Sequence, residues 1–170
     1  MHKGALARGV LTLYLANASA PFPFQAQTWQ LVDHTNGSGT ETTHLLSTTS
    51  TNTYTSTNSP PKQALLQIKC FAPLTDSVTI SIDSDATFAV KTDATATLPI
   101  RLDDEPPIHA AWANLSLHQI LIYDLRNLLP SHQRIAISLP LGTRSPQPLT
   151  FDLSQLASAM RDFNCRRRLQ

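Results

Sequence analysis

The chain has 170 residues, the length of one ordinary domain, and its 13 basic and 12 acidic residues leave a net charge of +1. This balance excludes a broad basic surface for nucleic acid, and no apolar run approaches the roughly 20 residues that span a bilayer. Charged residues make up only 15% of the chain, below the usual ~25%, and serine and threonine take their place.

Residues 1–20 have the features of a signal peptide. Lys3 and Arg8 give a positive start, a short apolar stretch follows, and Ala18 ends a small-x-small cleavage site. We therefore expect an exported, periplasmic or secreted protein with a single domain over residues 21–170. The alternative is a leader that stays attached.

Cys70 and Cys165 are the two cysteines of the chain. Two cysteines are too few for a structural zinc site built on thiolates. In an oxidising compartment a disulfide is the default for such a pair. In a cytosolic protein the same residues would be two independent buried thiols.

The first strand is predicted over residues 28–32. A Thr/Ser-rich segment, expected to be mainly a loop, follows over residues 35–61. Within it, residues 41–48 suit an edge strand, because threonine fits a pleated surface. We expect residues 49–61 to form a mobile loop rather than a glycosylated stalk.

Further strands are predicted where apolar residues recur with the period of a pleated strand, which places one face on a core and the other in water. Pro99 lies inside one of these runs and indicates an edge position or a bulge there. The predicted strands cover residues 66–70, 78–82, 94–102, 108–115, 117–123, 135–139 and 149–151.

Two helices are predicted near the end of the chain. Asp124 is expected to cap a short helix that Pro130 stops. Asp152 is expected to cap the terminal helix. We therefore predict an α+β fold, in which an antiparallel sheet of about six to eight strands is covered mainly by the terminal helix, with the short helix also packed on it. The apolar face of the terminal helix is predicted to comprise Leu153, Leu156, Ala157, Met160 and Phe163.

Catalytic motifs are missing from the sequence. It has no G-x-S-x-G, H-E-x-x-H or C-x-x-C motif and no glycine-rich phosphate loop, and its six histidines lack metal-ligand spacing. We predict no enzyme activity, no metal and no cofactor. The one enzymatic alternative, a hydrolase, would need His109 or His118 beside Asp103 or Asp124 in a pocket.

Two acidic clusters, residues 83–85 and 103–105, lack the spacing of a calcium-binding loop, so we predict solvated turns. Arg101 stands two residues before Asp103 on the same strand face, where the two can pair with each other or bind a partner. Trp112 is either an exposed anchor for a partner or, as is more common for a tryptophan on a strand, part of the core.

Four stretches occur together in one order along the chain: residues 29–32, residues 65–70, residues 99–103 followed by Trp112, and residues 151–156 leading to Cys165. In this order the chain resembles the VasI/TagO-like family of type VI secretion-associated periplasmic proteins, from Trp29 to the end of the chain. The resemblance implies that Cys70 and Cys165 pair and tie the last helix to a strand, and it carries no catalytic residues. Gln155 departs from the family's usual glycine.

We predict a non-enzymatic periplasmic accessory protein of a type VI secretion apparatus, which acts by contacting another protein of the cell envelope. Arg101, Asp103 and Trp112 are the candidate residues for that contact. The alternative is an immunity protein or inhibitor that binds a secreted effector in the periplasm through a loop or an edge strand. Neither hypothesis involves nucleic acid or an integral membrane span, and the oligomeric state is left open.

Overall fold

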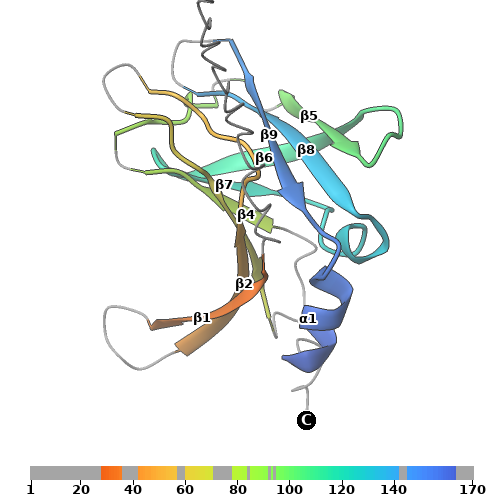
Figure 1. The fold of residues 1–170 in the computed structure, drawn as a ribbon. Helices are drawn as coiled ribbons and strands as arrows, with labels where there is room; N and C mark the ends of the chain where they lie inside the picture. Colours follow the sequence, from red (N-terminus) through yellow and green to blue (C-terminus); the bar gives the residue numbers. More distant parts are fainter. Residues whose placement is uncertain are drawn as a thin grey trace, which may run out of the picture.

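The computed structural model describes residues 28–35, 42–56, 60–70, 78–83, 85–91, 93, 95–141 and 145–163. Within these residues, nine strands form one antiparallel sheet, accompanied by a 3-10 helix, η1 (Leu129–Ser131), and an α-helix, α1 (Leu156–Asp162) (Figure 1). The strands are β1 (Gln30–Thr35), β2 (Thr42–Thr49), β3 (Leu65–Lys69), β4 (Val78–Ser81), β5 (Thr97–Leu102), β6 (Ile108–Ser116), β7 (Gln119–Ile122), β8 (Arg134–Leu139) and β9 (Gln147–Asp152).

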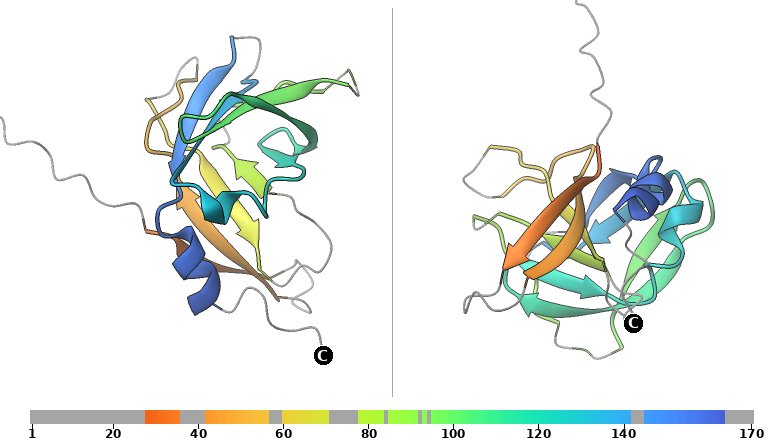
Figure 2. Two further views of the ribbon diagram at one scale, coloured as in Figure 1. Left: turned by 90° about the vertical axis from the view of Figure 1, so that its right-hand side faces the viewer. Right: turned by 90° about the horizontal axis from the view of Figure 1, so that it is seen from below.

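The strands lie in the order β1-β2-β3-β4-β7-β6-β5-β8-β9. β6 joins the two halves of this sheet, because residues 108–111 pair with β5 and residues 112–116 pair with β7. The register of β6 shifts between Asn114 and Ser116, and such a bulge bends a strand and increases its twist. The sheet curves into a half-barrel, whose strands surround a common centre in the end-on view of Figure 2.

The alternation seen in the sequence is confirmed in the strands. β5 alternates between exposed and buried residues along its whole length, with Leu98, Ile100 and Leu102 inside. Because the sheet is curved, the inward side chains of its two halves meet and form the core. The largest fully buried side chains include Tyr54, Phe88, Phe151, Leu46, Leu66, Ile68, Ile80, Ile100, Ile120 and Ile122.

Strand number and edge positions differ from the prediction. The described sheet has nine strands rather than about six to eight. β2, expected at an edge, lies between β1 and β3. β5, which contains Pro99, is also an interior strand, since it lies between β6 and β8. The proline is tolerated because the pairing of β5 with β8 begins only at Ile100. The missing N–H of the proline therefore interrupts no pairing with β8.

The short helix begins where the sequence predicted that it would end. Asp124 does not cap it, since this residue has a left-handed φ of 60° and lies in a turn before the helix. η1 begins at Leu129 and contains Pro130 in its first turn. Proline suits that position, because the first N–H groups of a helix have no partner within the helix.

The start of the terminal helix also differs from the prediction. Asp152 is the last residue of β9, and its carboxylate accepts a hydrogen bond from the N–H of Ser154 at 2.8 Å. This short turn separates the strand from α1, which begins at Leu156. The carboxylate of Asp152 therefore closes a turn rather than capping the helix.

The helix is too short to cover the sheet as predicted. Its buried residues are Leu156, Ala159 and Met160, whereas Ala157 and Phe163, which were expected on the apolar face, are exposed. Seven residues of α-helix span only about 10 Å. α1 packs on η1 at one end of the half-barrel, and the sheet fills its concave side with its own side chains.

Candidate functional site

Arg101 is the one exposed residue among the three predicted partner-binding candidates. It alternates with the buried residues Ile100 and Leu102 on β5, so its side chain leaves the outer face of the half-barrel. Its cross-strand neighbour on β8 is Ala136. A guanidinium next to so small a side chain is accessible to a partner.

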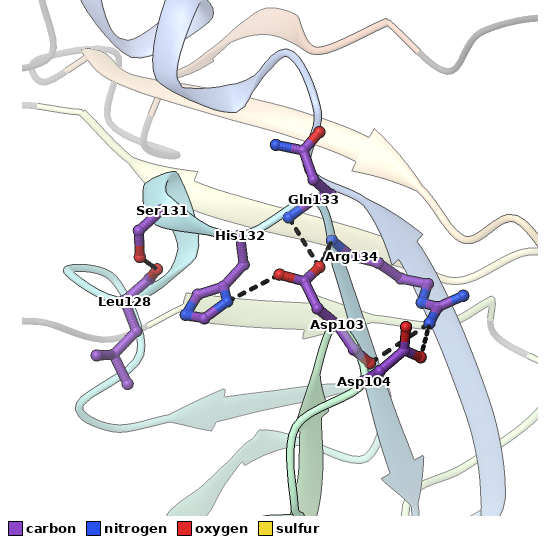
Figure 3. Close-up of polar contacts among 7 residues, drawn as sticks. All are labelled: Asp103, Asp104, Leu128, Ser131, His132, Gln133 and Arg134. Carbon is purple, nitrogen blue, oxygen red and sulfur yellow. Dashed lines mark hydrogen bonds and ion pairs between the residues drawn. The ribbon is translucent and has the colours of Figure 1, made fainter.

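Asp103 does not pair with Arg101, which was one of the two possibilities raised by the sequence, but holds the start of β8 (Figure 3). One oxygen of its carboxylate accepts the backbone N–H groups of Gln133 and Arg134, each at 2.9 Å. The other oxygen lies 3.0 Å from Nδ1 of His132. Asp103 has a left-handed φ of 48°, a conformation that aspartate tolerates better than most residues.

The environment of Asp103 alters its acidity. Burial raises the pKa of the carboxyl, but the hydrogen bonds from His132 and from the two backbone amides together lower it by more. The pKa of Asp103 therefore lies below its ordinary value of 3.8, and the carboxylate is ionised at neutral pH. Its three contacts join the turn after β5 to the start of β8, which indicates a structural role.

Trp112 belongs to the core, since only 6% of the residue is exposed. The ammonium of Lys91 lies 5.6 Å from the centre of its ring and donates a hydrogen bond to its carbonyl oxygen at 2.8 Å. The N–H of Lys91 donates to the side chain of Asn114, also at 2.8 Å. Lys91 and Trp112 therefore fasten the segment before β5 to β6, and the ring of Trp112 is covered.

The histidines considered for a hydrolase have other neighbours. His118 donates from Nδ1 to the carbonyl oxygen of Ala86 at 2.7 Å, and Nδ1 of His109 lies 3.3 Å from the hydroxyl of Thr97. The histidine beside Asp103 is His132 instead. Within the described parts of the chain, no group of three or more His, Cys, Asp or Glu side chains is arranged to hold a metal ion.

A cluster around Lys62 was not foreseen from the sequence. The ammonium of Lys62 lies 3.0 Å from a carboxylate oxygen of Asp83 and 3.3 Å from one of Asp85, and its hydrogen bond to Asp83 is the main reason that its pKa is raised. The hydroxyl of the buried Tyr54 accepts the N–H of Asp83 at 2.8 Å. Burial is the main reason that the pKa of Tyr54 is raised. Asp83 and Asp85 are thus both anchored, Asp83 by Lys62 and Tyr54 and Asp85 by Lys62.

The Thr/Ser-rich segment, predicted to be mainly a loop, contains strand β2 and a well-packed continuation of it. Ser50 is fully buried, and its hydroxyl accepts the N–H of Ala64 at 3.0 Å. Farther along, Tyr54 and Lys62 form a backbone bridge. Most of the segment outside residues 36–41 and 57–59 therefore has defined contacts.

The outer edge of β9 is covered by this same segment. The N–H of Thr51 donates to the carbonyl oxygen of Thr150 at 2.7 Å. The side-chain amide of Asn52 donates to the carbonyl oxygen of Pro148 at 2.9 Å and accepts the N–H of Thr150 at 2.8 Å. Asn52 thus pairs with β9 as a peptide group of a neighbouring strand would, and the contacts form a seam between residues 51–52 and β9.

The outer edge of β1 has no such cover among the described residues. Cys70 donates its N–H to the carbonyl oxygen of His44, so the backbone groups of His44 point toward β3. Asp33 is paired with His44, and its own N–H and C=O therefore point away from β2. The backbone groups of every second residue along a strand point to the same side, so the N–H and C=O groups of Leu31 and Thr35 also point away from β2. Among the described residues, the N–H and C=O groups of these three residues have no backbone partner, and we call them the free ladder of β1.

Apolar side chains accompany this free ladder. Leu31 is 40% exposed and Val32 is 38% exposed. Leu31 lies opposite the buried Leu46, on the concave face, whereas Val32 lies opposite Leu45, on the outer face. β1 also lacks proline and lysine, two residues with which proteins protect edge strands from pairing. This edge is the surface of the described structure best suited to bind another protein.

Other predicted features fall partly outside the described residues. The leader, residues 1–20, and Cys165 are not among them, so their assignments remain predictions. Cys70, at the end of β3, is buried. In the part of the chain that is described, every helix is too short or too polar to span a membrane. A search of known protein families, of curated proteins and of solved structures finds no match to this chain.

Proposed function

We propose that the protein is a non-enzymatic accessory protein of the bacterial cell envelope, associated with a type VI secretion apparatus, and that it binds another protein at the edge of β1. The observation that carries this proposal is the difference between the two edges of the sheet. Among the described residues, residues 51–52 cover the edge of β9, whereas none pairs with the outward backbone groups of β1. An available ladder of this kind is what an extended partner segment recognises.

The compartment is proposed from the sequence. The leader over residues 1–20 and the resemblance to VasI/TagO-like proteins both favour the periplasm. Cys70 is buried at the end of β3, a position from which a disulfide to Cys165 would tie the end of the chain to the sheet. An oxidising compartment would favour that bond.

A second candidate function uses the same edge. An immunity protein or inhibitor that blocks a secreted effector could also pair with it through β1, since strand addition provides main-chain hydrogen bonds to any extended segment. The two functions differ in the identity of the bound protein. A component of the secretion apparatus supports the accessory role, and a toxic effector supports the alternative.

The experiment blocks the ladder without damaging the sheet. Leu31→Pro removes an N–H that points away from β2, so β1 keeps its pairing with β2. Leu31→Ala is the matched control, because it removes the side chain and keeps the N–H. Arg101→Ala tests the exposed outer face of β5 separately. Circular dichroism and thermal unfolding verify that each variant is folded.

Proteins bound to the wild type are recovered from envelope extracts, identified, purified and titrated against each variant. We expect Leu31→Pro to weaken binding at least about tenfold, the equivalent of 1.4 kcal/mol, and Leu31→Ala to weaken it less. Equal affinities of the folded Leu31→Pro variant and the wild type would refute binding at β1. If only Arg101→Ala loses binding, the partner binds the outer face of β5 instead of the edge of β1.

A further inference from the structure

We infer that the segment that pairs with β1 comes from a different protein, and that it places a basic side chain opposite Asp33 and an apolar side chain opposite Leu31. This inference rests on the proposed function and specifies its partner. It follows from three features of β1: the direction of its free backbone groups, the distribution of its side chains over the two faces, and the one charge it carries.

The free ladder determines which residues of a partner strand lie opposite β1. Leu31 and Asp33 direct their N–H and C=O groups outward, so each forms a hydrogen-bonded pair with one residue of an added strand. Val32, between them, faces its neighbour without direct backbone bonds, and in such pairs the side chains come closer together. The side chains of residues 31–33 therefore select those of the partner.

A second copy of the chain fits this ladder poorly. A two-fold symmetric dimer would pair β1 with β1 of the second copy in an antiparallel arrangement. Two registers place outward-pointing backbone groups opposite each other and pair five of the six residues of β1. One register is centred on Asp33 and brings two carboxylates directly opposite each other, which is destabilising. The other is centred on Val32 and places Leu31 opposite Asp33 at two positions. A heterologous strand avoids both conflicts.

The charge of β1 favours a basic partner residue. The side chain of Asp33 is 60% exposed, and Nδ1 of His44 lies 2.6 Å from its Oδ1 atom. No described residue donates to its Oδ2 atom, which can accept a donor from an added strand. Opposite charges on facing residues of paired strands stabilise the pairing. Lysine or arginine opposite Asp33 therefore meets a carboxylate at the free edge.

The two exposed apolar side chains favour apolar neighbours. Leu31 continues the concave face beyond the buried Leu46, so an apolar residue opposite Leu31 would extend the core by one strand. Val32 offers the same contact on the outer face. For an antiparallel partner, read from its amino end, the recognised segment is a basic residue, then a β-branched or apolar residue, then an apolar residue.

Two synthetic peptides with blocked ends test this specificity on the full chain. One has the sequence Thr-Thr-Lys-Val-Leu-Thr, and the other has glutamate in place of lysine. Binding is measured from the shifts of the backbone amide resonances of residues 31 and 33. We expect the lysine peptide to bind roughly tenfold more tightly than the glutamate peptide, from the sum of one attractive and one repulsive cross-strand pair.

Charge reversal at Asp33 supplies the decisive comparison. In Asp33→Lys the preference should invert, so that the glutamate peptide binds more tightly. Glu105→Lys is the matched control: it makes the same change in net charge at an exposed position in the turn after β5, and it should leave the preference unchanged. Equal binding of the two peptides, or a preference that Asp33→Lys does not invert, would overturn the inference.

Two further results separate this inference from the proposed function. If Leu31→Pro abolishes capture of the envelope protein but the peptides bind equally, the function stands and the stated partner chemistry is wrong. If the peptide preference inverts as expected but capture is insensitive to Leu31→Pro, the chemistry of the edge stands and the proposed function is wrong. A dimer in solution that Leu31→Pro dissociates would overturn the choice of a different protein.

Discussion

Asn52→Ala tests whether the seam between residues 51–52 and β9 stabilises the half-barrel. The substitution removes the hydrogen bond that the side chain donates to Pro148 and the one that it accepts from Thr150. The neighbouring backbone bond from Thr51 to Thr150 does not involve the side chain of Asn52 and remains possible. The variant therefore isolates the contribution of one side-chain amide to the closure of the sheet.

The expected loss follows from the two bonds. A typical intramolecular hydrogen bond contributes about 0.5–1.5 kcal/mol net to stability. Asn52 is exposed, so water can replace part of each interaction and the sum should fall near about 1–2 kcal/mol. For a domain of this size, that loss lowers the melting temperature by about 2–8 °C.

Calorimetry and hydrogen exchange measure the two consequences. We expect a lower melting temperature and faster exchange of the Thr150 amide, while amides at the centre of β3 keep their protection. Asn127→Ala is the control, because it makes the same chemical change at an exposed position in the turn before η1. If Asn52→Ala and Asn127→Ala unfold at the same temperature, or if exchange at Thr150 is unaltered, the side chain of Asn52 does not stabilise the seam.

Three further predictions concern Trp112, Asp103 and the two cysteines. Trp112→Ala should lower the free energy of unfolding by about 3–5 kcal/mol in chemical denaturation, because it empties a core position, and Trp112→Phe should lower it less; unchanged stability would contradict burial of the ring. Because the pKa of Asp103 is lowered below 3.8, its ionised carboxylate stabilises the fold above that pH, and this contribution is lost as the pH falls through the lowered pKa. The stability difference between the wild type and Asp103→Asn should therefore shrink between about pH 5 and pH 2, and a constant difference would refute the assignment. If Cys70 and Cys165 pair, reduction should add the mass of two hydrogens to the intact protein and should cost about 4–5 kcal/mol for a closed loop of about 100 residues; two free thiols in protein from the periplasm would disprove the bond.

Strands could be located from the sequence because their signal is local. The alternation of Leu98, Ile100 and Leu102 with polar residues and Pro99 needs no knowledge of neighbouring strands, and the structure confirms the buried and exposed faces. The helix starts were harder to predict. Asp152 has the composition of a helix cap, but the strand continues through it, and its carboxylate closes a turn with Ser154.

The candidate site depended on long-range contacts and was only partly predictable. Arg101 is exposed, as a partner-binding residue must be. Nothing in the sequence near Asp103, however, indicates that its two carboxylate oxygens accept hydrogen bonds from residues 132–134. The free edge was hidden for a related reason. The local sequence pattern predicts that β1 is a strand. Its position at the end of the sheet depends on the order of all nine strands, which no local pattern indicates.

The seam also has a consequence for the order in which the molecule can assemble during synthesis. Thr51 and Thr150 are 99 positions apart in the chain, so residues 51–52 leave the ribosome long before their partners on β9 exist. Until then the groups of residues 51–52 that later bond to β9 lack these partners, and exposed edges of incomplete domains are prone to aggregate.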